Sequence, residues 1–206
     1  MTDVYTIVWN EEFMLPHFLD HYENVADRIF IIDDHSTDKT AEIAQAHPKV
    51  QYFEYGFDGL DEDEFNDTFE SFYKTFSRGW VAVVDCDEFI TGLLTLGEPN
   101  GQVLKTNGYM MIGKTGRLED CKSIRMKSWD KPIVFDSKLD VRFGAGRHSV
   151  NLPVTDSSLE LLHYKYPSRE YYIERNTEGY KRIAGMDEKE QTKRLRMGLN
   201  WYDSRA

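Results

Sequence analysis

Four short apolar runs, separated by residues of helical periodicity, divide the first 90 residues of this chain. The runs are Val4–Trp9, Arg28–Ile32, Val50–Tyr55 and Trp80–Val84. Helices are expected between them at about 11–22, 39–46 and 63–76, with an acidic loop at 56–64. Near-continuous apolar strands that alternate with helices are typical of a parallel sheet covered on both faces. We therefore predict an α/β fold.

Polar clusters follow three of these strands and are expected to lie on one rim of the sheet. They are Asn10-Glu11-Glu12, Asp33-Asp34 and Asp85–Glu88. Ligands of such sheets bind outside the carboxyl ends of the strands. In extended backbone Asp85 and Asp87 would point the same way, because side-chain direction has a period of two residues. Such a pair suits a hard divalent cation, whereas the simpler interpretation is a solvated acidic turn.

The second half of the chain has a looser pattern, which we interpret as a continuation of the same sheet. Short strands are expected near 108–113, 122–127, 132–136 and 141–143, and an apolar strand at Leu159–His163. Helices are expected at about 169–183 and 187–197. Because 206 residues suffice for one substantial core, we expect a single domain.

The composition narrows the class of partner. A formal net charge of -11 argues against a nucleic-acid duplex, because a protein that binds the phosphate backbone carries a basic face. Two cysteines are too few for a disulfide scaffold or a zinc ribbon, and reduced thiols in the cytosol are the simple interpretation. No uncharged run approaches the ~20 apolar residues of a membrane span, and residues 1–25 lack a secretory signal. We therefore expect a cytoplasmic protein that does not bind nucleic acid.

Three runs taken together resemble the GT-A nucleotide-sugar glycosyltransferases, in particular their family 2-like branch. They are Val8-Trp9-Asn10-Glu11-Glu12, Ile31-Ile32-Asp33-Asp34-His35-Ser36-Thr37-Asp38 and Val84-Asp85-Cys86-Asp87-Glu88-Phe89. The later runs that are also similar to that branch are Lys131–Val134, Gly146–Ser149, Leu161–Tyr166 and Glu174–Asn176. The resemblance implies a GT-A (Rossmann-like) domain with a mixed central sheet flanked by helices. It also implies a donor half at 1–90, an acceptor half at 91–185 and a C-terminal tail or helix at 186–206.

The same resemblance implies an activity and a set of site residues. The activity is a metal-dependent, inverting transfer of a sugar from a UDP-linked donor to a carbohydrate or lipid-linked acceptor, as in polysaccharide biosynthesis. The implied ligands of Mn²⁺ or Mg²⁺ are Asp85, Asp87 and His163. The residues implied to bind the nucleotide sugar are Asn10, Glu12, Asp33, Asp34, Asp85 and Lys165. A lipid-linked acceptor would place the protein at the inner face of the membrane, and the oligomeric state stays open.

Several of these residues have a simpler structural role open to them. The run that contains Asp33 and Asp34 is typical of a helix N-cap. Glu12 could stabilise the dipole of the helix that follows it. A histidine at a strand end, such as His163, is often a hydrogen-bonded core residue, and Lys165 could be a surface charge. The motifs alone leave these alternatives open.

The catalytic base is the residue that the sequence identifies least. An inverting transfer needs a carboxylate or an imidazole near the acceptor hydroxyl. His148 and Asp120 are the candidates and Asp136 is a rival, although Asp120 follows Asp87 early for the family. Two other classes remain: a catalytically silent nucleotide-binding domain of this fold, and a phosphatase of the haloacid dehalogenase type. The phosphatase motif has Thr or Val where this chain has Phe89.

Overall fold

The structure is a computed structural model that describes residues 1–56, 62–183 and 186–206. Its strands are β1 Thr2–Val8, β2 Arg28–Asp33, β3 Val50–Glu54, β4 Trp80–Val83, β5 Glu88–Thr91, β6 Val103–Ile112, β7 Lys122–Arg125, β8 Lys131–Asp136 and β9 Val154–Tyr166. Its helices are α1 Met14–Tyr22, α2 Thr40–Ala46, α3 Glu62–Phe76, α4 Arg169–Lys181 and α5 Glu188–Asp203. Most of the expected acidic loop at 56–64 lies outside the described residues.

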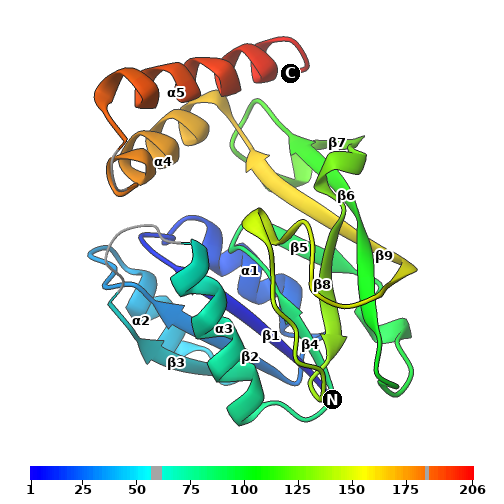
Figure 1. The fold of residues 1–206 in the computed structure, drawn as a ribbon. Coiled ribbons are helices and arrows are strands. Elements are labelled where there is room, and N and C mark those ends of the chain that lie inside the picture. The colour runs from blue at the N-terminus through cyan, green and yellow to red at the C-terminus, as the bar shows by residue number, and fades with distance from the viewer. Residues whose placement is uncertain (57–61, 184–185) are drawn as a thin grey trace.

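The described strands form one mixed sheet in the order β3-β2-β1-β4-β8-β6-β9-β5, with β7 paired to β6. The first four are mutually parallel, as the sequence predicts, and β8 joins β4 in the antiparallel direction. Helix α1 packs on one face of the sheet through Leu15 and Phe18, and α3 packs on the other face through Phe69 and Tyr73 (Figure 1). The predicted GT-A arrangement of a mixed sheet between helices is therefore confirmed.

The second half departs from the expected elements in three places. The predicted strand at 141–143 is wrong, because only an isolated bridge from Phe143 to Val150 forms there. Strand β9 begins at Val154, earlier than expected, and α5 continues to Asp203. The first residues of β9 pair with Val103–Lys105 of β6, and the end of α5 packs Leu199, Trp201 and Tyr202 into a cluster with Tyr166, which the local pattern does not reveal.

Strand β5 was not predicted, and it changes the geometry of the acidic cluster. The backbone turns at residues 85–87, where the Glu88 amide donates to the Asp85 carbonyl at 2.9 Å. The expectation that Asp85 and Asp87 share one direction in extended backbone is therefore wrong. After the turn, β5 pairs antiparallel with β9 and sets Glu88 directly opposite His163. The pairing joins the acidic turn to the second half of the chain.

Helices α4 and α5 lie together beyond the ends of the sheet (Figure 1). Helix α4 begins after β9 with Ser168 as its N-cap, whose hydroxyl accepts a hydrogen bond from the Tyr171 amide. Tyr202 of α5 is buried and donates to the Gly113 carbonyl at 2.8 Å, which fixes α5 to the end of β6. Within the described residues, no helix combines the length and apolar character that crossing a membrane requires.

Candidate active site

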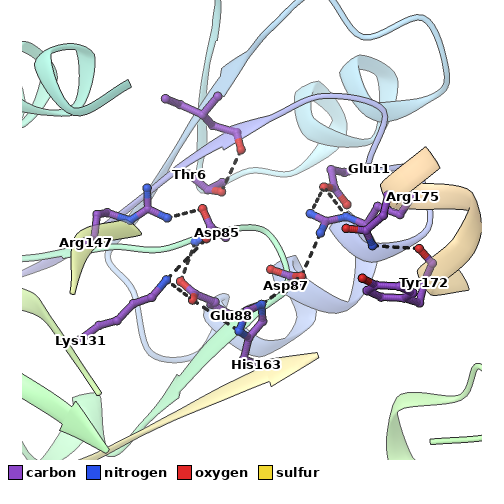
Figure 2. Close-up of polar contacts among 12 residues, drawn as sticks. Thr6, Glu11, Asp85, Asp87, Glu88, Lys131, Arg147, His163, Tyr172 and Arg175 are labelled. Carbon is purple, nitrogen blue, oxygen red and sulfur yellow. Dashed lines mark hydrogen bonds and ion pairs between the residues drawn. The ribbon is translucent and has the colours of Figure 1, made fainter. Parts of the chain in front are cut away.

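Asp87 is a deeply buried carboxylate of the acidic turn, with 2% of the residue exposed. Its Oδ2 accepts a hydrogen bond from Arg175 Nη1 at 3.0 Å and lies 3.4 Å from His163 Nε2 (Figure 2). Burial raises the pKa of Asp87, but the charge of Arg175 and the contact with His163 outweigh it and hold the pKa far below its ordinary value. Asp87 is therefore an ionised carboxylate at any physiological pH.

Arg175 of α4 also binds Glu11, in the loop after β1. Its Nη2 and Nε lie 2.5 Å and 3.2 Å from Glu11 Oε1. Burial raises the pKa of Glu11, and the charge of Arg175 opposes that effect. Arg175 thus bridges two rim loops that are far apart in sequence, and it anchors α4 to both.

Asp85 and Glu88 face a second pair of cations. Asp85 forms an ion pair with Arg147, and its other oxygen lies 3.7 Å from Lys131 Nζ. Burial raises the pKa of Asp85, but Arg147 and Lys131 outweigh it and lower the pKa to about 2. Glu88 is fully buried, with one oxygen 2.5 Å from Lys131 Nζ and the other accepting from the Asp85 amide at 3.0 Å. Glu88 is therefore not a solvated acid of a turn.

Arg147 reaches Asp85 from a strained backbone. Gly146 and Arg147 have φ values of 60° and 57°, and the second is a region that residues with a Cβ rarely adopt. The guanidinium also lies over the Phe69 ring of α3, 5.7 Å from its centroid. Strained backbone of this kind persists where surrounding contacts fix it, and it concentrates at functional sites.

Trp129 connects the two histidines that the sequence identified. Its ring centroid lies 4.7 Å from that of His163 and 5.6 Å from that of His148. Burial lowers the pKa of His148, and the nearby charge of Lys131 lowers it further. Lys165 Nζ lies 5.4 Å from the Trp129 centroid, and no carboxylate of the described residues lies within 4.0 Å of it. Burial lowers the pKa of Lys165, while the charge of Asp87 opposes that effect.

The residues implied to bind a nucleoside divide into two groups. Asn10 and Glu12 bond to the loop after β2: the Thr37 amide donates to Asn10 Oδ1 at 2.8 Å, and the Lys39 amide donates to Glu12 Oε2 at 3.2 Å. Asp33 accepts from Ser36 and from the Tyr52 hydroxyl at 2.7 Å. These bonds hold the loop itself.

Asp34 differs from those three residues, because its carboxylate faces a side chain from the far end of α4. The residue is 4% exposed, and Oδ2 forms an ion pair with Arg182. The same guanidinium lies over the Trp9 ring. Among Asn10, Glu12, Asp33 and Asp34, Asp34 is the residue whose carboxylate is covered by a side chain from the end of α4.

Asp120 lies apart from the other predicted residues. It belongs to an exposed turn before β7, where its carboxylate accepts from the Thr115 hydroxyl at 2.7 Å and lies 3.9 Å from Arg117. None of its hydrogen bonds or ion pairs within the described residues reaches the acidic turn or His163. The structure therefore brings His148 near the cluster but not Asp120.

Sequence reasoning assigned no role to Lys131, Arg147 or Trp129. Lys131 opens an otherwise apolar strand, and a lysine that faces the core is a signal of a buried acidic partner. Arg147 and Trp129 carry no comparable local signal, because both lie in irregular segments. Within the described residues, no group of three or more histidine, cysteine or acidic side chains is arranged to hold a metal ion.

The first part of this chain is similar in sequence to a known family, and the whole fold is similar to solved structures. Residues 3–92 match the sequence profile of glycosyl transferase family 2. The crystal structure of S. aureus TarS 1-349 in complex with UDP-GlcNAc is similar over 100% of this chain and 73% of that chain, with 15% identity and a TM-score of 0.52. The same TarS fragment in complex with UDP covers 98% and 72%, with 14% identity and a TM-score of 0.51. No curated protein matches the sequence.

The arrangement of the sheet and its helices is thus the GT-A fold that glycosyltransferases have. Residues 3–92, the first part of the chain, are similar in sequence to glycosyl transferase family 2. This outcome confirms the resemblance read from the sequence.

Proposed function

We propose that the protein transfers a hexose from a UDP-linked sugar to a carbohydrate or lipid-linked acceptor, with inversion. The observation that carries the proposal is buried, ionised Asp87, held by Arg175 and His163 at the carboxyl end of β4. TarS, whose structure contains UDP-GlcNAc, has a similar fold, which supports a nucleotide-sugar donor. In this proposal residues 1–90 bind the donor, residues 91–185 bind the acceptor, and residues 186–206 form the C-terminal helix.

The balance of charge around Asp87 supports binding of a diphosphate together with a dication. The cluster contains four carboxylates and four cations: Glu11, Asp85, Asp87 and Glu88, with Lys131, Arg147, Lys165 and Arg175. A formally neutral cluster favours the joint entry of a dianion and a dication over either alone, because each alone would leave an uncompensated charge. Lys165 has no carboxylate partner among the described residues and is available to a phosphate oxygen, where a positioned cation would stabilise the leaving group.

The residues present fit a divalent metal ion with two protein ligands. Asp87 Oδ2 and His163 Nε2 converge, and His163 Nδ1 is buried with no hydrogen-bond partner among the described residues. Carboxylate oxygen and imidazole suit Mn²⁺, and Mg²⁺ commonly takes few protein ligands beside phosphate and water. Asp85 already faces Arg147 and Lys131, so we assign it to the ribose or to a water-bridged contact. When bound, the ion would neutralise charge on the diphosphate.

We assign the base that activates the acceptor hydroxyl to His148. It lies beside Trp129, which contacts His163, and its lowered pKa favours the neutral imidazole that can accept a proton. Asp120 is the weaker candidate because its turn is separate from this group of residues. On the donor side we assign the nucleoside contact to Asp34, while Asn10, Glu12 and Asp33 shape the loop around it.

The test measures nucleotide binding with and without metal in a matched pair of variants. UDP, GDP and free sugars are titrated by calorimetry into the wild type, Asp87→Ala and Asp156→Ala, with Mn²⁺ or with EDTA. We expect Mn²⁺-dependent UDP binding in the wild type and in Asp156→Ala, whose carboxylate is largely exposed, and its loss in Asp87→Ala. Absence of binding in the wild type, or unchanged binding in Asp87→Ala, would defeat the proposal.

Turnover separates the enzyme from a silent binding domain of the same fold. Incubation with UDP-sugars and carbohydrate acceptors should release UDP, and binding of UDP without any release would support the silent domain.

Cys86 and Cys121 are both free thiols, which supports the expected cytoplasmic location. A lipid-linked acceptor would bring the protein to the inner face of the membrane.

A further inference from the structure

Trp9 is a large aromatic residue at the ligand-binding end of β1 that serves no core. It is half-buried, and it contributes to none of the three hydrophobic clusters that the described residues form. One face of its ring is covered by the guanidinium of Arg182, whose Cζ lies 4.2 Å from the ring centroid. The carboxyl ends of parallel strands are where ligands of such sheets bind.

Arg182 completes this arrangement through Asp34, which follows β2, the neighbouring parallel strand. Arg182 Nη2 donates to Asp34 Oδ2, and the Asp34 amide donates to the Val8 carbonyl at 2.9 Å, so Trp9 and Asp34 are held side by side. Arg182 Nη1 is buried without a hydrogen-bond partner among the described residues. A buried donor left unpaired costs free energy, so the guanidinium fits its position incompletely.

The position of Arg182 matches the base end of a nucleotide that lies along α4. Arg182 follows Arg175 by seven residues, which is two helical turns or roughly 10.5 Å of helix. Arg175 binds Asp87, where the proposed function places the diphosphate. The guanidinium of Arg182 is planar, stacks on the Trp9 indole and donates an N–H to the Asp34 carboxylate. A nucleobase with a ring N–H, such as uracil or guanine, could make the same two contacts.

We propose that Trp9 and Asp34 form the binding site for the donor nucleobase and that the Arg182 side chain occupies this site. Arg182 then sets donor affinity because it competes with the nucleobase. The inference rests on the proposed function. A ligand that must displace a bound side chain has a weaker apparent affinity, because only the fraction of molecules whose site is open can bind it. Removal of the Arg182 side chain should therefore tighten nucleotide binding, which is the opposite of its effect if the arginine held the phosphates.

The test compares nucleosides with nucleotides, because a nucleoside has no phosphate. Uridine, UDP, guanosine and GDP are titrated by calorimetry into the wild type, Arg182→Ala, Arg182→Gln and Lys181→Ala. Lys181 is an exposed neighbour paired with Glu178 and serves as the matched control. We expect Arg182→Ala to bind the preferred nucleoside and its diphosphate about tenfold more tightly, by the same factor for both, as a cation–π contact of moderate strength implies.

Arg182→Gln keeps a planar amide beside Asp34 and lacks the charge, so it should fold even if the alanine variant does not and should bind with intermediate affinity. Weaker UDP binding with unchanged uridine binding would place Arg182 on the phosphates and overturn the inference. Equal affinities in all four proteins would also overturn it. If no protein binds any of the four compounds, the proposed function fails as well, which the previous two outcomes do not imply.

Discussion

Replacement of Lys131 by methionine isolates the buried ion pair beneath the acidic turn. Lys131 is 2% exposed and Glu88 is fully buried, with Nζ and Oε1 2.5 Å apart. Methionine retains the length and apolar packing of the lysine stem but removes the ammonium. Glu88 would then be a buried carboxylate whose remaining partners are the Asp85 amide and the more distant His163.

The expected loss of unfolding free energy is large. Removal of one partner of a buried pair leaves an uncompensated charge and costs about 3–5 kcal/mol. That is a substantial share of the ~5–15 kcal/mol that stabilises a typical domain. Urea unfolding followed by tryptophan fluorescence measures this change as a lower midpoint at unchanged slope.

Two companion variants make the result interpretable. Lys105→Met removes the same group from an ion pair of similar length with Asp156, but that pair is exposed, so stability should hardly change. Glu88→Gln added to Lys131→Met removes the buried charge and keeps an oxygen for the Asp85 amide, so most of the loss should be recovered. Equal losses in Lys131→Met and Lys105→Met, or no recovery in the double variant, would refute the reasoning.

Three further predictions follow from the surroundings of the site. Because the pKa of His148 is lowered, its imidazole stays neutral to lower pH. The apparent pKa of the acid limb of the kcat/KM profile should therefore lie below the ordinary histidine value of about 6.5, and this limb should disappear in His148→Gln. Gly108→Ala would bring a Cβ within 2.3 Å of the Trp129 carbonyl and should cost about 1–3 kcal/mol in urea unfolding, whereas Gly97→Ala meets nothing within 4 Å and should cost little. Cys86 is 1% exposed and burial raises its pKa, so Ellman's reagent should label it only after unfolding, and labelling of Cys86 in the native protein would contradict the structure.

The parallel half of the fold could be predicted from sequence because the local pattern of apolar residues identifies each of its strands and helices. The strands at Thr2–Val8 and Trp80–Val83 are apolar runs, and the helix at Met14–Tyr22 has a regular apolar stripe. Parallel strands that alternate with helices bury both faces, so local hydrophobicity and final burial agree. The predicted bounds therefore differ from the observed ones by only a few residues.

Strand β5 could not be predicted in the same way. Its first residue, Glu88, is an acid that local rules place in a solvated turn. The residue is buried because Lys131 and His163, which come much later in the chain, lie against it. The same reason explains the failed prediction that Asp85 and Asp87 point in one direction, since pairing with β9 begins at Glu88 and requires a turn before it.

In the candidate site, likewise, the acidic side chains could be predicted from sequence, whereas the cationic side chains that pair with them could not. The acids lie in or directly after the loops that follow β1 and β4, so a local motif identifies them. The cations that neutralise them come from the start of β8, from a strained loop and from α4, at Lys131, Arg147 and Arg175. The chain as a whole carries a net charge of -11, yet these three partners and Lys165 make the cluster of four carboxylates formally neutral. Composition alone would therefore suggest a site that repels a diphosphate, whereas the folded arrangement holds the cations that can receive one.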